Sequence, residues 1–110
     1  MEKLSTDLIV GATIRAAAME GIAVTIIHKG EANSGSLLLK INKLDGSAEV
    51  LSQVQIDDEM AWMPASGAPM EERDADTYIK DQISFDPDLW AIEIEDRQGR
   101  HWFDGEVLEV

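Results

Sequence analysis

The chain has 110 residues, of which 45% are apolar and 28% are charged, and its net charge at pH 7 is −13. This composition is typical of a folded protein, and the length predicts one compact domain over residues 1–110. The chain has no cysteine, which excludes disulfides, thiol catalysis and thiolate zinc sites. The excess of acidic side chains argues against nucleic-acid binding, which depends on Lys and Arg.

The negative charge is concentrated in the second half of the chain. Residues 1–55 carry five basic and six acidic side chains, whereas residues 56–110 carry four basic and sixteen acidic side chains. A surface of this kind keeps a protein soluble and monodisperse. The alternative is that the acidic half recruits a basic partner or a divalent cation.

The first predicted element is a helix from about residue 6 to residue 20, with N-cap side chains before it and Gly21 after it. The face expected to pack on the sheet contains Ile9, Ala12, Ala16 and Met19. A second apolar face contains Val10, Ile14, Ala17 and Ala18, and it suggests self-association as a homodimer. Arg15 and Glu20 interrupt the apolar run, so we expect no membrane span and no secretory signal.

Three strands are predicted next, over residues 22–29, 36–44 and 47–56. The Asp45-Gly46 pair predicts a tight type I′ hairpin turn between the second and third strands. That register places one apolar set on a core face, namely Leu37, Leu39, Ile41, Val50 and Val54. It places a polar set on a half-solvated face, namely Lys40, Asn42, Glu49 and Gln53.

The rest of the chain predicts a short strand at 60–63, a helix at 70–84, a strand at 89–95 and a possible edge strand at 100–103. The last seven residues are expected to fray. The fold class is therefore α+β, with a mainly antiparallel sheet of five or six strands and two helices on one face, in the order α-β-β-β-β-α-β(-β). The predicted core contains Ile9, Ala16, Val24, Ile26, Leu37, Leu39, Ile41, Val50, Val54, Ile79, Ile83, Trp90, Ile92 and Ile94.

Carboxylates near the end of the chain form the main candidate for chemistry. The possible acidic site contains Asp86, Asp88, Glu93, Glu95, Asp96 and His101. Glu93 and Glu95 alternate with Ile92 and Ile94, so a strand face exposed to solvent also explains these two glutamates. With no EF-hand spacing, no paired histidines and no nucleophile motif, the sequence predicts no catalytic residue, no cofactor and no bound metal.

Two tryptophans fall on short or edge strands, where they could serve either the core or an interface. Together with the second face of the first helix, they complete the possible interface, which contains Val10, Ile14, Ala18, Trp62 and Trp102.

Several stretches resemble a small bacterial family that is a domain of unknown function. The specific ones are Phe85-Asp-Pro-Asp-Leu-Trp90 and Glu93-Ile-Glu-Asp-Arg-Gln-Gly-Arg-His101. The resemblance extends from the first helix to about Phe103, and it implies a compact cytoplasmic protein of about this length. It implies no reaction, so no catalytic residue is carried over. The first helix departs from the family pattern, which leads us to expect more basic residues than Arg15.

These observations favour a non-enzymatic binding or accessory module that acts through protein–protein contacts. The expected partners are an unidentified protein and possibly a second copy of the chain, with no nucleic acid and no membrane. The alternative is a small enzyme or a ligand- or metal-binding protein that uses the acidic region from Asp86 to Asp104. An enzyme needs a concave site with converging polar groups, whereas a binding module needs only an apolar surface.

Overall fold

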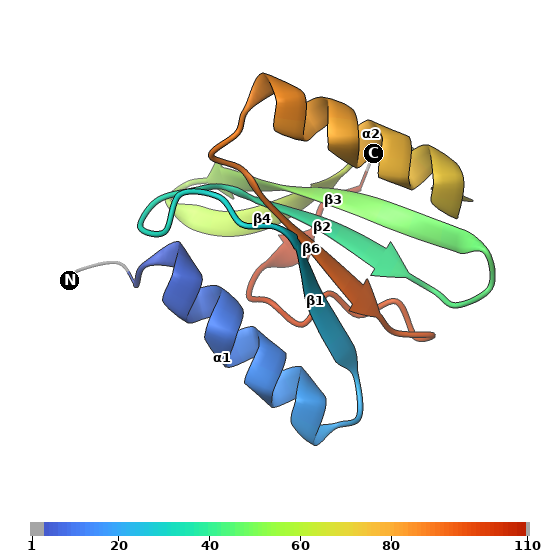
Figure 1. The fold of residues 1–110 in the computed structure, drawn as a ribbon, viewed down its shortest axis with the longest axis horizontal. Helices are drawn as coiled ribbons and strands as arrows, with labels where there is room; N and C mark the ends of the chain where they lie inside the picture. The colour runs from blue at the N-terminus through green and yellow to red at the C-terminus, as the bar shows by residue number, and fades with distance from the viewer. Residues whose placement is uncertain (1–3, 110) are drawn as a thin grey trace.

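The α+β fold is confirmed in the computed structural model, which describes residues 4–109 (Figure 1). The helices are α1 (Thr6–Met19) and α2 (Glu72–Phe85). The strands are β1 (Ala23–His28), β2 (Leu37–Asn42), β3 (Ser47–Ile56), β4 (Glu59–Pro64), β5 (Met70–Glu71), β6 (Trp90–Glu95) and β7 (Glu106–Val107). Neither helix has the length and apolar character that crossing a bilayer requires.

All seven strands belong to one sheet, in which six follow the order β1-β6-β2-β3-β4-β7 and β5 pairs with β3. The β2-β3-β4 meander is antiparallel, as predicted. The sheet as a whole is mixed, because β6 inserts between β1 and β2 and runs parallel to β2, and β7 runs parallel to β4. The parallel β2–β6 pair is possible because a long connection that includes α2 carries the chain across the sheet between them.

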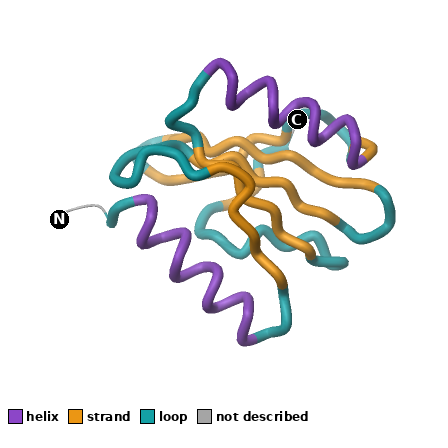
Figure 2. The backbone as a smooth tube through the Cα atoms, viewed as in Figure 1, coloured by secondary structure: helices purple, strands orange, loops and turns teal. Residues whose placement is uncertain are grey.

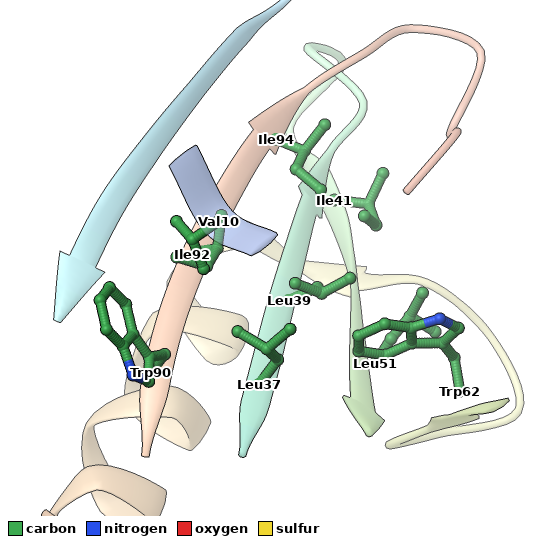
Figure 3. Close-up of a cluster of buried hydrophobic side chains, with 9 residues drawn as sticks. All are labelled: Val10, Leu37, Leu39, Ile41, Leu51, Trp62, Trp90, Ile92 and Ile94. Carbon is green, nitrogen blue, oxygen red and sulfur yellow. The ribbon is translucent and has the colours of Figure 1, made fainter. Parts of the chain in front are cut away.

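The two helices lie on opposite faces of the sheet, so the prediction that both cover one face is wrong (Figure 2). The cluster under α1 contains Val10, Leu37, Leu39, Ile41, Leu51, Trp62, Trp90, Ile92 and Ile94 (Figure 3). The cluster under α2 contains Leu38, Ala48, Val50, Ala75, Ile79 and Ala91. Strand β2 is buried along its whole length because it contributes to both clusters, as strands covered on both faces do.

The β2–β3 hairpin exists, but its register differs by one residue from the prediction. Leu39 lies opposite Leu51, and Asn42 lies opposite Ala48. A longer loop over residues 43–46 replaces the tight turn, because the side chains of Asn42 and Asp45 accept hydrogen bonds from the backbone N–H groups of Leu44 and Ser47. A one-residue shift moves each β3 side chain to the other face. Val50 therefore packs under α2, and the prediction that Val50 shares a face with Leu37, Leu39 and Ile41 is wrong.

The two faces of α1 are the reverse of those predicted. The buried face contains Thr6, Val10, Thr13 and Ala17. Met19, which belongs to the face predicted to pack on the sheet, is 85% exposed. Both threonines are buried with their hydroxyls satisfied, since they donate to the carbonyl oxygens of Gly35 and Ile9.

Most of the predicted core on the sheet is confirmed. The buried members are Leu37, Leu39, Ile41, Val50, Ile79, Trp90, Ile92 and Ile94. The half-buried members are Ile9, Val24, Val54 and Ile83. Ala16 and Ile26 are exposed, because the first lies on the outer face of α1 and the second on an edge strand.

The segment after β6 does not form the predicted edge strand at residues 100–103. Positive φ angles at Trp102 and Gly105 turn the chain, and β7 then pairs with β4. At Gly105 a side chain would collide with the carbonyl oxygen of Met60. The N–H of Leu108 also donates to the carbonyl oxygen of Trp62.

Candidate interaction surface

Exposed apolar side chains gather in one part of the molecule, which we call the α1–β1 unit and define as residues 4–30. Ten large apolar side chains are exposed among the described residues, and half of them lie in this quarter of the chain. They are Leu4, Leu8, Met19, Ile26 and Ile27. The other five are scattered over several elements. The unit is therefore the first candidate for contact with another protein.

The outer face of α1 contributes two of these five side chains, Leu8 and Met19, which flank the exposed Arg15. Its exposed residues include Leu8, Ala12, Ala16 and Met19, which helical geometry places on the side opposite Val10. The helix is held in place by its inner face and by its first turn. In that turn, the N–H groups of Thr6 and Asp7 donate to backbone carbonyls of the loop between β1 and β2. Its outer face is consequently free to contact a partner without disturbing the core.

Strand β1 contributes a sheet edge to the same unit. It is the terminal strand of the sheet and pairs with β6 alone. None of its six residues carries Asp, Glu, Lys or Arg. A shift in register between Ile26 and His28 marks a bulge at Ile27. Edge strands usually carry charges that discourage pairing with other chains, and β1 has only the bulge.

The net charge of the α1–β1 unit is zero. It contains two acidic side chains, Asp7 and Glu20, and two basic ones, Arg15 and Lys29. The net charge of −13 therefore comes from the rest of the chain. A neutral apolar area on a strongly acidic protein is the part that another acidic protein can approach with the least repulsion.

Of the predicted interface residues, only Ala18 lies on the exposed surface. Val10 and Trp62 are fully buried in the core, while Ile14 and Trp102 are half-buried against the same cluster. The indole N–H of Trp62 donates to the carbonyl oxygen of Asp104 over 2.8 Å. Both tryptophans that were predicted as interface anchors thus face inward, because the segment after β6, which includes Trp102, folds back over Trp62.

The residues of the predicted acidic site do not meet. Asp86 and Asp88 lie in the turn before β6, and Asp96 follows the opposite end of that strand. Glu93 points toward α2, where Lys40 contacts it, whereas His101 lies on the other face of the sheet against Trp62. Within residues 4–109, no three acidic or histidine side chains are gathered as metal ligands would be.

A buried lysine that the sequence analysis missed lies between β2 and α2. Its ammonium is 3.1 Å from Glu72, 2.6 Å from Asp76 and 3.5 Å from Glu93, and the amide of Asn42 donates to two of these carboxylates. Burial lowers the pKa of Lys40, but the hydrogen bonds to Asp76 and Glu72 outweigh it and raise the pKa above its usual value. A lysine held protonated is a poor nucleophile, so this network serves to attach α2 to the sheet.

Asp96 is a second buried charge with all its interactions inside the fold. Its carboxylate accepts hydrogen bonds from the Nε of Arg100 at 2.7 Å and the indole N–H of Trp102 at 2.9 Å. Burial raises the pKa of Asp96, and the hydrogen bonds from Arg100 and Trp102 more than reverse this, so that its pKa lies below the usual value. The guanidinium of Arg100 also lies 4.6 Å from the centre of the Trp102 ring. These contacts shape the loop after β6.

His101 is held by both of its ring nitrogens. Nε2 lies 3.0 Å from the carbonyl oxygen of Gly105, to which it donates, while Nδ1 accepts the N–H of Phe103 at 3.1 Å. Burial against Trp62 lowers the pKa of His101, which favours this neutral form. A general base needs a free nitrogen aimed at a substrate, and neither nitrogen is free in this arrangement.

The described surface also contains open depressions. One, of about 370 Å³, is lined by residues that include Glu49, Pro64, Ser66 and Leu108. The Ser66 hydroxyl is used locally, since it donates to the carbonyl oxygen of Ala68. Among the described residues that line this depression there is no histidine, lysine or arginine. Its polar side chains are those of Glu49, Ser66 and Glu109, so its described residues offer no cationic side chain that could stabilise a developing negative charge.

Comparison with known proteins agrees with this architecture. The model of a family described as "Protein of unknown function (DUF1491)" matches residues 4–104. A crystal structure of a DUF1491 family protein from Caulobacter crescentus CB15 is 38% identical, with a TM-score of 0.86, and the match covers 96% of this chain and 100% of that one. An NMR structure of a DUF1491 family protein from the same organism is 37% identical, with a TM-score of 0.83, and covers 98% and 99% of the two chains.

A more distant structure shares the fold alone. The solution structure of protein Atu0922 from A. tumefaciens is 21% identical, with a TM-score of 0.71, over 86% of each chain. No curated protein matches the chain. The family model and the two Caulobacter structures together confirm the resemblance to a domain of unknown function, and the chain belongs to the DUF1491 family.

Proposed function

We propose that this protein is a non-enzymatic binding module and that its α1–β1 unit makes the protein–protein contacts. The observation that carries the proposal is the concentration of exposed apolar side chains in residues 4–30, whose net charge is zero, in a chain whose net charge is −13. Apolar area drives association, and the absence of net charge removes the repulsion that the rest of the surface would impose on an acidic partner.

The arrangement of the polar side chains supports a binding role over a catalytic one. Lys40, Asp96 and His101 are the most conspicuous titratable groups, and each is engaged by neighbours in the fold. Among the described residues, no buried side-chain nitrogen or oxygen lacks a hydrogen-bond partner. Catalytic groups, in contrast, keep a donor, acceptor or lone pair directed at the substrate.

We place this module in the cytoplasm as part of the same proposal. A chain without cysteine gains no cross-link from an oxidising compartment.

The test compares two exposed residues that end the two helices. Met19 is the last residue of α1 and is 85% exposed, and Phe85 is the last residue of α2 and is 82% exposed. A photoreactive amino acid is placed at one position or the other, and cells of the native host are irradiated. We expect discrete cross-linked products from position 19 and none from position 85. Equal products from both positions, or none from position 19, would contradict a contact made by α1.

A further inference from the structure

We propose that the free edge of β1 pairs with β1 of a second copy of this chain, so that two sheets join into one across a two-fold axis. This inference rests on the proposed function and names its partner. It uses the strand edge of the α1–β1 unit, whereas the contact proposed above requires only the exposed face of α1.

The first argument is the character of the edge itself. Within residues 4–109 no strand lies beyond β1. On that side, the backbone N–H and C=O groups of every second residue therefore have no hydrogen-bond partner in another strand of this chain. The strand reads Ala-Val-Thr-Ile-Ile-His, which is rich in β-branched residues and free of formal charge at neutral pH. An uncharged edge with these side chains is a template for strand addition.

The second argument explains why the added strand belongs to a copy of the same chain. Two copies repel each other through every surface of the acidic part, whose net charge is −13. The α1–β1 unit has a net charge of zero, so it is where the copies can meet without that penalty. A basic partner would gain more from the acidic surfaces and would leave this neutral edge unused.

The third argument is symmetry. Two identical strands paired antiparallel are related by a two-fold axis, which gives a closed dimer rather than a growing fibre. The bulge at Ile27 interrupts regular pairing, so the ladder is confined to residues 23–26 of each copy. The bulge thus limits how strongly the edges associate.

The size of the contact predicts a weak dimer. Strand β1 has six residues and α1 has 14, so each is about 20 Å long. A strip of that length, about 10 to 15 Å wide, is smaller than the roughly 800 Å² per partner of a standard interface. We therefore expect a weak dimer, with a dissociation constant between about 1 μM and about 1 mM.

The first experiment measures mass by light scattering or sedimentation equilibrium from about 1 μM to about 1 mM of purified protein. The wild type should pass from monomer to dimer within this range. Ile27→Lys, at the edge, and Ile56→Lys, at the end of β3, make the same chemical change at side chains that are 43% and 46% exposed. Ile27→Lys should weaken the dimer at least about tenfold, because it places a charge beside each end of the paired segment, where charged side chains discourage strand addition, whereas Ile56→Lys should leave it unchanged.

A second experiment needs no variant and so is unaffected if Ile27→Lys folds poorly. Hydrogen exchange of the wild type is compared at low and high protein concentration. Backbone amides of β1 should become more protected as concentration rises, while those of β4 and β7 should not change.

The outcomes separate this inference from the proposed function. A wild type that stays monomeric up to about 1 mM overturns the dimer, yet cross-links from position 19 to another protein would still support a binding module. A dimer that protects α1 amides but not β1 amides overturns edge pairing while retaining self-association. A dimer weakened equally by both lysine variants would also overturn the assignment to β1.

Discussion

The two edges of the sheet have opposite properties. At one edge, β4 is followed by β7, and the N–H of Leu108 donates to the carbonyl oxygen of Trp62. Acidic residues surround that edge, with Glu59 in β4 and Glu106 in β7. At the other edge, the terminal strand β1 has six residues, compared with two in the terminal strand β7, and it has no formally charged side chain. The chain thus covers and charges one edge and leaves the other neutral and available.

The two helices repeat this difference on a smaller scale. Helix α2 is polar on its outer side and is attached to the sheet through the carboxylates of Glu72 and Asp76, which contact Lys40. Helix α1 is attached through Val10 and its neighbours, and it is apolar on its outer side as well. That outer side exposes Leu8 and Met19 beside Arg15, and apolar side chains in such a position form a surface for another neighbour. We therefore expect the partner of the proposed binding module to contact the α1–β1 unit.

The largest expected effect comes from opening the covered edge. Trp62→Ala removes a fully buried ring together with its hydrogen bond to Asp104, and it should lower the free energy of unfolding by about 3 to 5 kcal/mol. Urea denaturation measures the loss, and the amide of Leu108 should lose its protection from hydrogen exchange. Trp102→Ala, at a half-buried ring, should cost less. Equal losses from the two variants would mean that Trp62 does not hold the covered edge.

The next effect concerns the attachment of α2. Lys40→Met leaves the surrounding carboxylates without their cation, which should cost about 2 to 3 kcal/mol of unfolding free energy, less than for a fully buried pair because those carboxylates are partly exposed. Lys43→Met is the control, since the Lys43–Glu49 pair is about one-third exposed on both sides and should contribute no more than about 1 kcal/mol. Equal thermal shifts from the two variants would show that the buried network does not secure α2.

A smaller effect distinguishes the two faces of α1. Val10→Ala removes buried methyl groups from a side chain that is 1% exposed and should cost about 2 kcal/mol. Leu8→Ala removes a larger side chain from the outer face and should change the free energy of unfolding by no more than about 0.5 kcal/mol. Chemical denaturation at low protein concentration isolates this difference from dimer formation. A greater loss from Leu8→Ala would reverse the assignment of faces.

The smallest effect is a pH dependence at the covered edge. Folding lowers the pKa of His101 from 6.5. As pH falls, the unfolded chain therefore takes up a proton on His101 before the folded chain does. The contribution of His101 to stability is present above pH 6.5 and is lost as pH falls below it. The pKa of Asp96 is also lowered, and its contribution is lost only below its ordinary 3.8. The pKa of Lys40 is raised, so its contribution remains until pH exceeds 10.5. Urea denaturation from pH 8 to pH 5 should show a decline that His101→Gln removes; a decline of the same size in that variant would assign it to other groups.

Local pattern in the sequence was sufficient to predict both helices, the strands β1 to β4 and β6, and their order, but not the two-residue strands β5 and β7. The bounds of β3 are those predicted, and α1 ends within one residue of its prediction. These features depend on short-range physics, namely helical periodicity, β-branched runs and turn residues. The α+β class followed from the same information, as did the antiparallel meander of β2, β3 and β4.

Only the tertiary structure decided which faces are buried. Thr6 and Thr13 lie on the core face of α1 because carbonyl oxygens close by satisfy their hydroxyls, which apolar periodicity does not register. Lys40 is buried because α2, remote in sequence, brings two carboxylates to it. The edge position of β1 likewise depends on β6 inserting beside β2. Apart from the local hydrogen bond of Thr13 to Ile9, each of these outcomes depends on a partner distant in sequence, and the candidate surface is what those partners left uncovered.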